Sequence, residues 1–450
     1  MSEALYEQRP LGDAVDRHIG GGTPPRQVPS YWKGNIPWAS VKDFSEQKSV
    51  ILDTEEHISA AGLHVSASNL IPAQTPLVCT RMAVGRAALP VVPMAINQDV
   101  KALVPASGVS AEYLLKLMQH IQPLAEGRAV GSTVKGIRIQ EYLNIPVPLA
   151  PQNAQPIIAK ILDTLDTAIR ESEALINKLK AIKQGLLHDL LTRGIDANGQ
   201  LRPPQSEAPQ LYKESPLGWV PKEWTVAGLA SAVQKDRAVI RTGPFGSSLK
   251  GEHWRESGRP VVTIGSLGDG AFIESELLFI DEKTAEQLVD FELCTGDIAF
   301  SRVADVGRSV VITEEQRGWI MSSNFMRISV DSEKARPRLL QLLLASSILV
   351  RKQVRMTVNS AGRDVANSAV LMALRFPWPM PEEQDQIIER VESFERKVAM
   401  EEAQHQKLLA AKEGLMDDLL SGRVRVTSLL EAAQQVAAPI AHQPVGQPGA

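Results

Sequence analysis

Four arginines beside two glycine turns have the right chemistry to contact nucleic acid. Arg81 and Arg86 flank a Val-Gly-Arg turn at Gly85, and Arg302 and Arg308 flank a second one at Gly307. Arginine can donate two hydrogen bonds to guanine O6 and N7 or bind phosphate, and a glycine turn allows close backbone approach. The alternative interpretation is a structural hairpin whose arginines pair with nearby acids.

Other basic residues gather in corresponding parts of the two halves of the chain. The full set of these further candidates is Arg351, Lys352, Arg355 and Arg363 in the second half, Arg128, Lys135 and Arg138 in the first, and Lys250 in a glycine-rich loop. Clustered positive charge can neutralise phosphates, although a formal net charge of −4 gives no overall signature of nucleic-acid binding. A solvated helix end explains the second-half cluster equally well.

Motifs for catalysis and for metal binding are not found in the sequence. There is no GxxxxGK[ST] phosphate loop, no Asn-Pro-Pro-aromatic methyltransferase signature, and no HxxxH or CxxC metal spacing. Asp43 with Glu46-Gln47-Lys48 loosely resembles a nuclease cluster, but charged side chains mostly lie on protein surfaces. Cys79 and Cys294 suggest buried free thiols. We therefore expect no catalytic residues and no metal site in this chain.

The elements that must position the basic residues are duplicated. NKLKAIKQGLLHDLLTRG, which begins at Asn177, is repeated as QKLLAAKEGLMDDLLSGR from Gln406 (406 − 177 = 229), with nine identities in eighteen aligned positions. The Val-Gly-Arg turns align as well (307 − 85 = 222). A period this long indicates two whole domains rather than a solenoid.

Apolar residues at heptad spacing around both copies predict two long helices that pack on each other. The expected helix from Ala154 to Leu191 is introduced by proline and stopped by Gly194, and its counterpart ends at Ser421-Gly422. Gly185 and Gly414 inside the helices suggest close approach of the other helix or of a docked partner, with shared ancestry as the alternative. The predicted helix-pair interface comprises Ile158, Ile161, Leu165, Leu175, Leu179, Ile182, Gly185, Leu186, Val391, Phe394, Val398, Leu408, Gly414, Leu415 and Leu419.

The sequence therefore predicts an α+β protein in which two repeated globular α/β domains are separated by two long helices packed as an antiparallel coiled coil. The expected plan is a domain at 1–150, a helix at 151–194, a Pro-rich linker at 195–222, a domain at 223–379, a helix at 380–425 and a disordered tail at 426–450. No apolar stretch is long enough to cross a bilayer, and the N-terminus lacks a signal-peptide pattern, so we expect a cytoplasmic protein without membrane contact.

The order of these elements and their sequence motifs resemble those of the specificity subunit of Type I restriction-modification enzymes. The matching stretches are GGTP with a following YW and IPW; SPLGWVPKEW; GPFGSSLK with a later GDG; LCTGDIAFSR followed by VGR; and PWPMPEEQDQI leading into KEGLMDDLLSG. Together they cover the chain from about residue 11 to 425 in collinear order.

This resemblance implies a DNA-reading role. It implies that residues 1–150 and 223–379 are target-recognition domains, each reading one half of a bipartite sequence in double-stranded DNA. It also implies that the helices set the spacing and dock two methyltransferase subunits, that motor-nuclease subunits join the complex, and that S-adenosylmethionine, ATP and Mg belong to those partners. The alternatives are a self-contained DNA methyltransferase or nuclease with unrecognised motifs, or a coiled-coil adaptor without DNA affinity.

Overall fold

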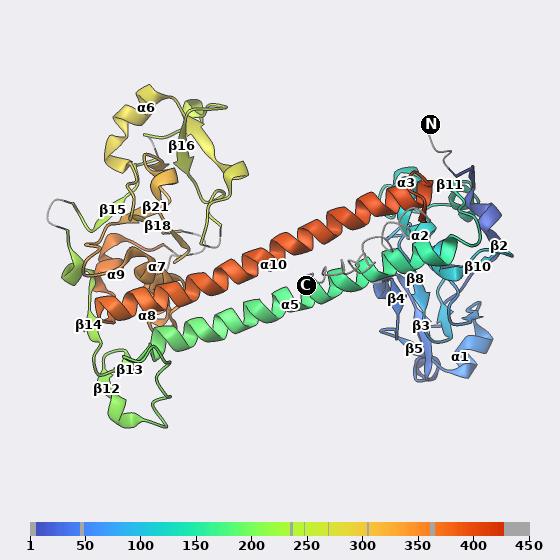
Figure 1. The fold of residues 1–450 in the computed structure, drawn as a ribbon, viewed down its shortest axis with the longest axis horizontal. Coiled ribbons are helices and arrows are strands. Elements are labelled where there is room, and N and C mark those ends of the chain that lie inside the picture. Colours follow the sequence, from blue (N-terminus) through green and yellow to red (C-terminus); the bar gives the residue numbers. More distant parts are fainter. Residues whose placement is uncertain are drawn as a thin grey trace, which may run out of the picture. The chain divides into compact units, whose positions relative to one another are not determined.

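The chain folds into two compact units. Each unit contains one globular domain, one end of the first long helix and one end of the second. The computed structural model describes residues 6–45, 49–234, 237–246, 248–268, 270–303, 306–360 and 365–426. The first unit comprises residues 1–175 and 401–450, and the second comprises residues 176–400. The long helices are α5 (Gln155–Thr192) and α10 (Pro381–Ser421) (Figure 1). The first begins and ends one residue later than the expected Ala154–Leu191. The expected disordered tail, beyond Val426, lies outside the described residues.

The first globular domain is built on two main sheets and a short strand pair. The five-stranded sheet has the order β2 (Val15–Ile19), β10 (Val100–Pro105), β7 (Leu77–Cys79), β8 (Ala87–Pro90), β4 (Val50–Ile51). The four-stranded sheet has the order β5 (His57–Ile58), β3 (Ile36–Ala39), β9 (Met94–Ile96), β6 (Leu70–Ile71), and β1 (Gln8–Pro10) pairs with β11 (Pro146–Pro148). Its helices are α1 (Ala60–Val65), α2 (Ala111–His120), α3 (Gln122–Arg128) and α4 (Ile139–Leu143).

The second globular domain repeats this arrangement with fewer strands. Its four-stranded sheet has the order β15 (Ile240–Thr242), β21 (Phe325–Ile328), β18 (Ile298–Ser301), β19 (Ser309–Val311). A three-stranded sheet has the order β17 (Leu278–Ile280), β16 (Arg259–Val262), β20 (Ile320–Met321), and β14 (Thr225–Ala227) pairs with β22 (Phe376–Trp378). Its helices are α6 (Glu282–Gln287), α7 (Pro337–Ser346), α8 (Ile348–Ser360) and α9 (Ser368–Ala373).

The two domains share one topology, as the duplication predicts. In both, the four aligned strands of the larger sheet pair antiparallel, β2-β10-β7-β8 in one domain and β15-β21-β18-β19 in the other. In both, the central strand of the smaller sheet has one antiparallel and one parallel neighbour. The predicted strand, Val-Gly-Arg turn and returning strand are β7-β8 and β18-β19, and both turn glycines have positive φ, +83° and +105°.

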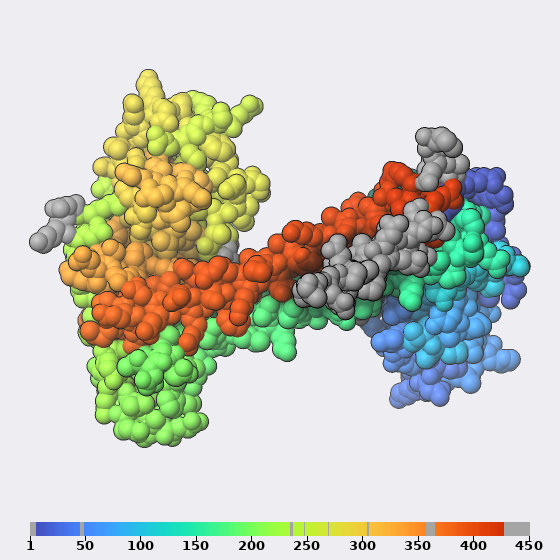
Figure 2. Space-filling view, in the orientation of Figure 1, coloured from blue at the N-terminus to red at the C-terminus, as the bar shows by residue number. Residues whose placement is uncertain are grey.

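Both long helices contribute to the core of each globular domain. In the first unit, Ile158 and Leu162 of α5 and Leu419 of α10 pack with α2. In the second unit, Leu190 of α5 and Val391 of α10 pack with the leucines of α7, and Figure 2 shows the start of α10 lying against the orange residues of this domain. Because each unit holds the beginning of one helix and the end of the other, the helices run antiparallel within it. Among the described residues, no helix is long and apolar enough to cross a membrane.

The Pro-rich segment after α5 is ordered and not a plain linker. Its prolines prevent a long helix, as expected, but strands β12 (Tyr212–Ser215) and β13 (Gly218–Pro221) form a hairpin. Before the hairpin, Ile195 is 2% exposed and Arg202 is 7% exposed. Arg202 donates to the Glu383 carboxylate at the start of α10, with Nη2 3.1 Å from Oε2. Composition predicted a linker because Glu383, the buried partner of Arg202, lies far away in the sequence and gives no local signal.

The described chain begins against the end of α10, inside the first unit. The Tyr6 backbone N–H donates to the Ser421 carbonyl at 2.9 Å, and the Arg425 guanidinium lies 4.5 Å from the centre of the Tyr6 ring. Gly422, with φ of +77°, ends the helix here, and a Cβ at this position would lie 2.8 Å from the Tyr6 ring. The chain's first described residues therefore cover the C-terminal end of its last helix.

Candidate nucleic-acid interface and helix junctions

The arginines beside the two Val-Gly-Arg turns differ in their exposure to solvent and in their hydrogen-bond partners. Arg81 is half exposed, and its Nη1 lies 3.4 Å from Oδ1 of the buried Asp99. Arg302 and Arg308 are half-buried and donate to main-chain carbonyls, at 3.3 Å to Ala366 and 3.1 Å to Ile264. The two second-half arginines therefore hydrogen-bond to main-chain carbonyls of their own domain, and not to the nearby acids that the alternative interpretation expected. Arg81 combines an acid partner with access to solvent, and Arg86 is half-buried.

The remaining basic candidates are mostly accessible. Arg128, Lys135, Arg138, Lys250, Lys352 and Arg355 are exposed. Arg351 is half-buried and donates to the Ala345 carbonyl at 3.1 Å, and Arg363 lies outside the described residues. The second-half cluster lines a pocket of about 540 Å³ that also includes the exposed Ile348 and Met356 and, from α5, His188. Exposed cations are therefore present in both domains.

The nuclease-like sequence around Asp43 has a structural explanation in its described part. The Asp43 carboxylate accepts the backbone N–H groups of Ser40 and Glu55, each at 2.8 Å, and so caps a short 3-10 helix. Residues 46–48 lie outside the described part of the chain. The carboxylate therefore stabilises a turn.

The sequence interpretation missed a cluster of charges where α2 meets both long helices. Asp166 of α5 is 7% exposed and accepts from Lys116 of α2 at 2.7 Å and from Lys412 of α10 at 2.6 Å. The Ser49 hydroxyl donates to the same carboxylate at 3.1 Å. Burial alone would raise the pKa of Asp166, but the two ammonium groups outweigh burial and hold this pKa below its ordinary value.

An equivalent cluster lies in the second unit. Glu395 of α10 accepts from Arg338 of α7 at 2.5 Å and from Lys183 of α5 at 2.9 Å. Burial acts to raise the pKa of Glu395, and the two cations reverse the effect and lower it. The three residues correspond to those of the first unit through the repeat (395 − 166 = 229, 412 − 183 = 229, 338 − 116 = 222). Aligned charges in the two halves were the signal that could have revealed both clusters.

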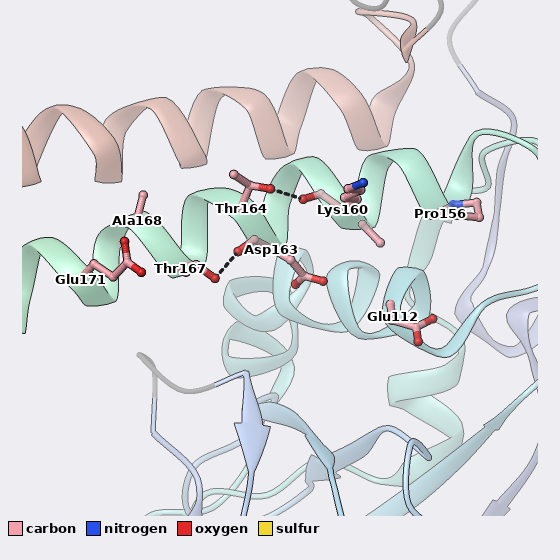
Figure 3. Close-up of a pocket in the computed structure, with 9 residues that line it drawn as sticks. Glu112, Pro156, Lys160, Asp163, Thr164, Thr167, Ala168 and Glu171 are labelled. Atoms are coloured by element: carbon pink, nitrogen blue, oxygen red, sulfur yellow. Dashed lines mark hydrogen bonds between the residues drawn. The ribbon is translucent and has the colours of Figure 1, made fainter.

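Beside the first cluster, α2 and α5 border an open groove of about 670 Å³. Figure 3 shows Glu112 on α2 facing the row of α5 side chains that includes Asp163 and Glu171. Thr164 and Thr167 turn back to donate to the carbonyls four residues earlier, at 2.8 Å and 2.9 Å. Asp163 also pairs with Lys116 at 2.6 Å. The charged residues that line the groove are three acids, Glu112, Asp163 and Glu171, and one lysine, Lys160, which makes it unsuited to phosphate.

Burial varies along the predicted helix-pair interface, and Ile158, Val391 and Leu419 belong to the cores of the globular domains. Ile158, Val391, Val398 and Leu419 are buried, and a further set is half-buried, namely Ile161, Leu165, Leu179, Leu186, Phe394, Leu408 and Leu415. Leu175 and Ile182 remain 41% and 43% exposed, so they are not enclosed by the other helix. A straight helix has 3.6 residues per turn, and its apolar stripe drifts away from a strict heptad seam.

Gly185 and Gly414 do not mark a close approach of the two helices. Both are exposed, and a Cβ built at either position would meet nothing within 4 Å. The expectation that the facing helix requires these glycines is therefore wrong, while a docked partner and shared ancestry stay open as explanations.

Replacing either glycine with alanine should therefore stabilise the isolated chain. Gly185→Ala and Gly414→Ala are each expected to raise the free energy of unfolding by about 1 kcal/mol, because glycine inside a helix is disfavoured by that amount. Chemical denaturation of each variant beside the parent chain would measure the change. A loss of stability in either variant would mean that the position is sterically restricted after all.

Comparison with known proteins gives a consistent result. A family model described as the Type I restriction modification DNA specificity domain matches residues 4–181 and 238–410. The MjaVIII Type I restriction enzyme specificity subunit of Methanocaldococcus jannaschii is 24% identical over 321 residues, which are 70% of this chain and 71% of that protein. The MjaIX specificity subunit of the same organism is 24% identical over 260 residues, 57% of each chain. The crystal structure of the Type I restriction-modification S subunit from M. genitalium has a similar fold, with a TM-score of 0.56 and 14% identity over 93% of this chain and 97% of that one.

Proposed function

Because the chain belongs to the Type I restriction-modification DNA specificity family, we propose that its two globular domains each read one half of a bipartite DNA sequence. The observation that carries this proposal is the shared topology of the two domains, each joined to one end of both long helices. Two related readers on one chain suit a ligand with two separate sites, and base contacts in the DNA grooves supply the sequence specificity.

We further propose that the chain is not itself catalytic. In this proposal it holds methyltransferase subunits at the target adenine, and the methyltransferase and motor-nuclease subunits bring S-adenosylmethionine, ATP and Mg. Flipping and methylating a base requires a neighbouring element that reads the surrounding sequence and holds the register. The exposed cations Arg128, Lys135, Arg138, Lys352 and Arg355 are the proposed phosphate contacts, and Arg81 is the proposed base contact.

Exchange of one domain tests the proposal. Residues 223–379 would be replaced by the corresponding domain of a relative, and the chain would be combined with its methyltransferase subunit, S-adenosylmethionine and a randomised DNA library. Sequencing of the methylated adenines is expected to show that one half of the target changes while the other half is retained. A target that changes in both halves, or in neither, would contradict a division of reading between the domains.

The chain without partners provides the control. Incubated with DNA and S-adenosylmethionine, it is expected to transfer no methyl group, since that chemistry is assigned to another subunit. Methyl transfer by the purified chain alone would support the self-contained methyltransferase instead.

A further inference from the structure

One carboxylate in each unit connects three separate elements. Asp166 joins α5 to α2 through Lys116 and to α10 through Lys412, and Glu395 makes the corresponding connections from α10. We name these clusters the first triad, Lys116, Asp166 and Lys412, and the second triad, Arg338, Glu395 and Lys183. Each triad therefore binds a globular domain to both long helices at once.

The triads are shielded from water to different degrees. In the first, the Lys116 side chain is 0% exposed, that of Asp166 is 8% exposed and that of Lys412 is 25% exposed. In the second, the three side chains are 22% to 30% exposed. Displacing Asp166 would take the buried counter-charge from the fully buried Lys116 and leave it with only the half-exposed Asp163, which is unfavourable.

The apolar contacts between the two long helices select the register of the helices less strictly than the triads do. Apolar residues that recur every heptad can be matched again after a shift of one repeat, whereas a charged or polar group at one position selects a single register. Leu175 and Ile182 are largely exposed, so the apolar seam is also incomplete. Buried ion pairs contribute little net stability compared with apolar side chains of similar size, and their best-attested role is to select register.

We propose that the two triads are positioning residues that hold each globular domain in one register on the helix pair and thereby restrict the gap accepted between the two half-sites. This inference rests on the proposed function and deepens it, because it names the residues that control spacing, as distinct from those that read bases. The residues of the triads do not themselves contact DNA in this proposal.

The test replaces each triad by apolar residues of similar size. One variant carries Lys116→Met, Asp166→Leu and Lys412→Met, and a second carries Arg338→Met, Glu395→Leu and Lys183→Met. Each variant would be assembled with the methyltransferase subunit and given DNAs that keep both half-sites but lengthen or shorten the gap by one base pair. The measured quantity is the ratio of methylation rates on the preferred gap and on the altered gap.

Both triad variants are expected to lower this ratio by at least about tenfold, which corresponds to about 1.4 kcal/mol of discrimination. The half-site sequences and the midpoint of chemical denaturation are expected to stay close to those of the parent chain, since apolar replacement preserves packing. The control is the pair Arg259→Gln with Glu282→Gln, an ion pair at 2.8 Å within the second globular domain, which should leave the ratio unchanged. A folded triad variant that discriminates between gaps as well as the parent does would overturn the inference.

A single substitution keeps the test decisive if a triple variant fails to fold. Lys412→Met removes only the partly exposed cation of α10 and leaves Lys116 paired with Asp166. It should lower the gap ratio in the same direction, and an unchanged ratio in this folded variant would refute the role of the first triad. Failure of the parent complex to methylate any bipartite sequence would instead refute the proposed function, so the two outcomes are distinguishable.

Discussion

Replacement of Glu383 by alanine is expected to lower the free energy of unfolding of the second unit by about 3 to 5 kcal/mol, the range typical of breaking a buried ion pair. The Glu383 side chain is 9% exposed and accepts from three different groups. The donors are the Arg202 guanidinium, the Ile195 backbone N–H at 2.8 Å and the Trp224 indole N–H at 3.0 Å. The alanine variant removes the acceptor of the Ile195 and Trp224 N–H groups and the buried counter-charge of Arg202.

Asp385, two residues later on the same helix turn, provides the matched control. Its carboxylate pairs with Arg336 at 2.7 Å, but the Asp385 side chain is 56% exposed. An exposed ion pair contributes about 1 kcal/mol at most, so Asp385→Ala should have a small effect. Chemical denaturation of the two variants would compare them, and equal losses would show that Glu383 is not a buried anchor.

Replacement of Leu190 or Leu419 by alanine is expected to destabilise the unit that holds the leucine by about 2 to 5 kcal/mol. The two leucines are equivalent through the repeat, each is 0% exposed, and each belongs to the core of a different unit. Removing most of such a side chain leaves a cavity that the surrounding core fills only partly.

Hydrogen exchange can assign each loss to a unit. Leu190→Ala should lower the protection of amides in β18 and α7, and Leu419→Ala should lower the protection of amides in α2, because these elements share the affected cores. Leu409→Ala is the control, since Leu409 is 39% exposed. Loss of protection in the unit that keeps its leucine would contradict two separately stabilised cores.

The sequence predicted the features that depend on local pattern. Heptad spacing, proline at the start and glycine at the end placed both long helices within a few residues, because these signals act on the backbone near them. The Val-Gly-Arg turns were recognisable because a positive φ strongly favours glycine. The duplication then implied a second domain of the same plan, which the shared order of four strands in the larger sheets confirms.

Features that depend on distant partners were not predictable in the same way. Arg302 and Arg308 were expected at a surface, but the carbonyls that hold them belong to Ala366 and Ile264, 64 and 44 residues away. Predicting the first triad would have required the knowledge that α2 and α10 both contact α5 at Asp166. Periodicity likewise could not show that Gly185 and Gly414 face open space.

The hydrogen bond between Tyr6 and Ser421 has a mechanical consequence for the first unit. Polypeptide termini usually fray independently, since each end separates from its neighbours without disturbing the other. Here the end of α10 and Tyr6 cover one another, so opening of either segment removes a contact from the other. Cleavage near Tyr6 and cleavage near Ser421 should therefore be linked, because loss of either segment removes a contact that covers the other.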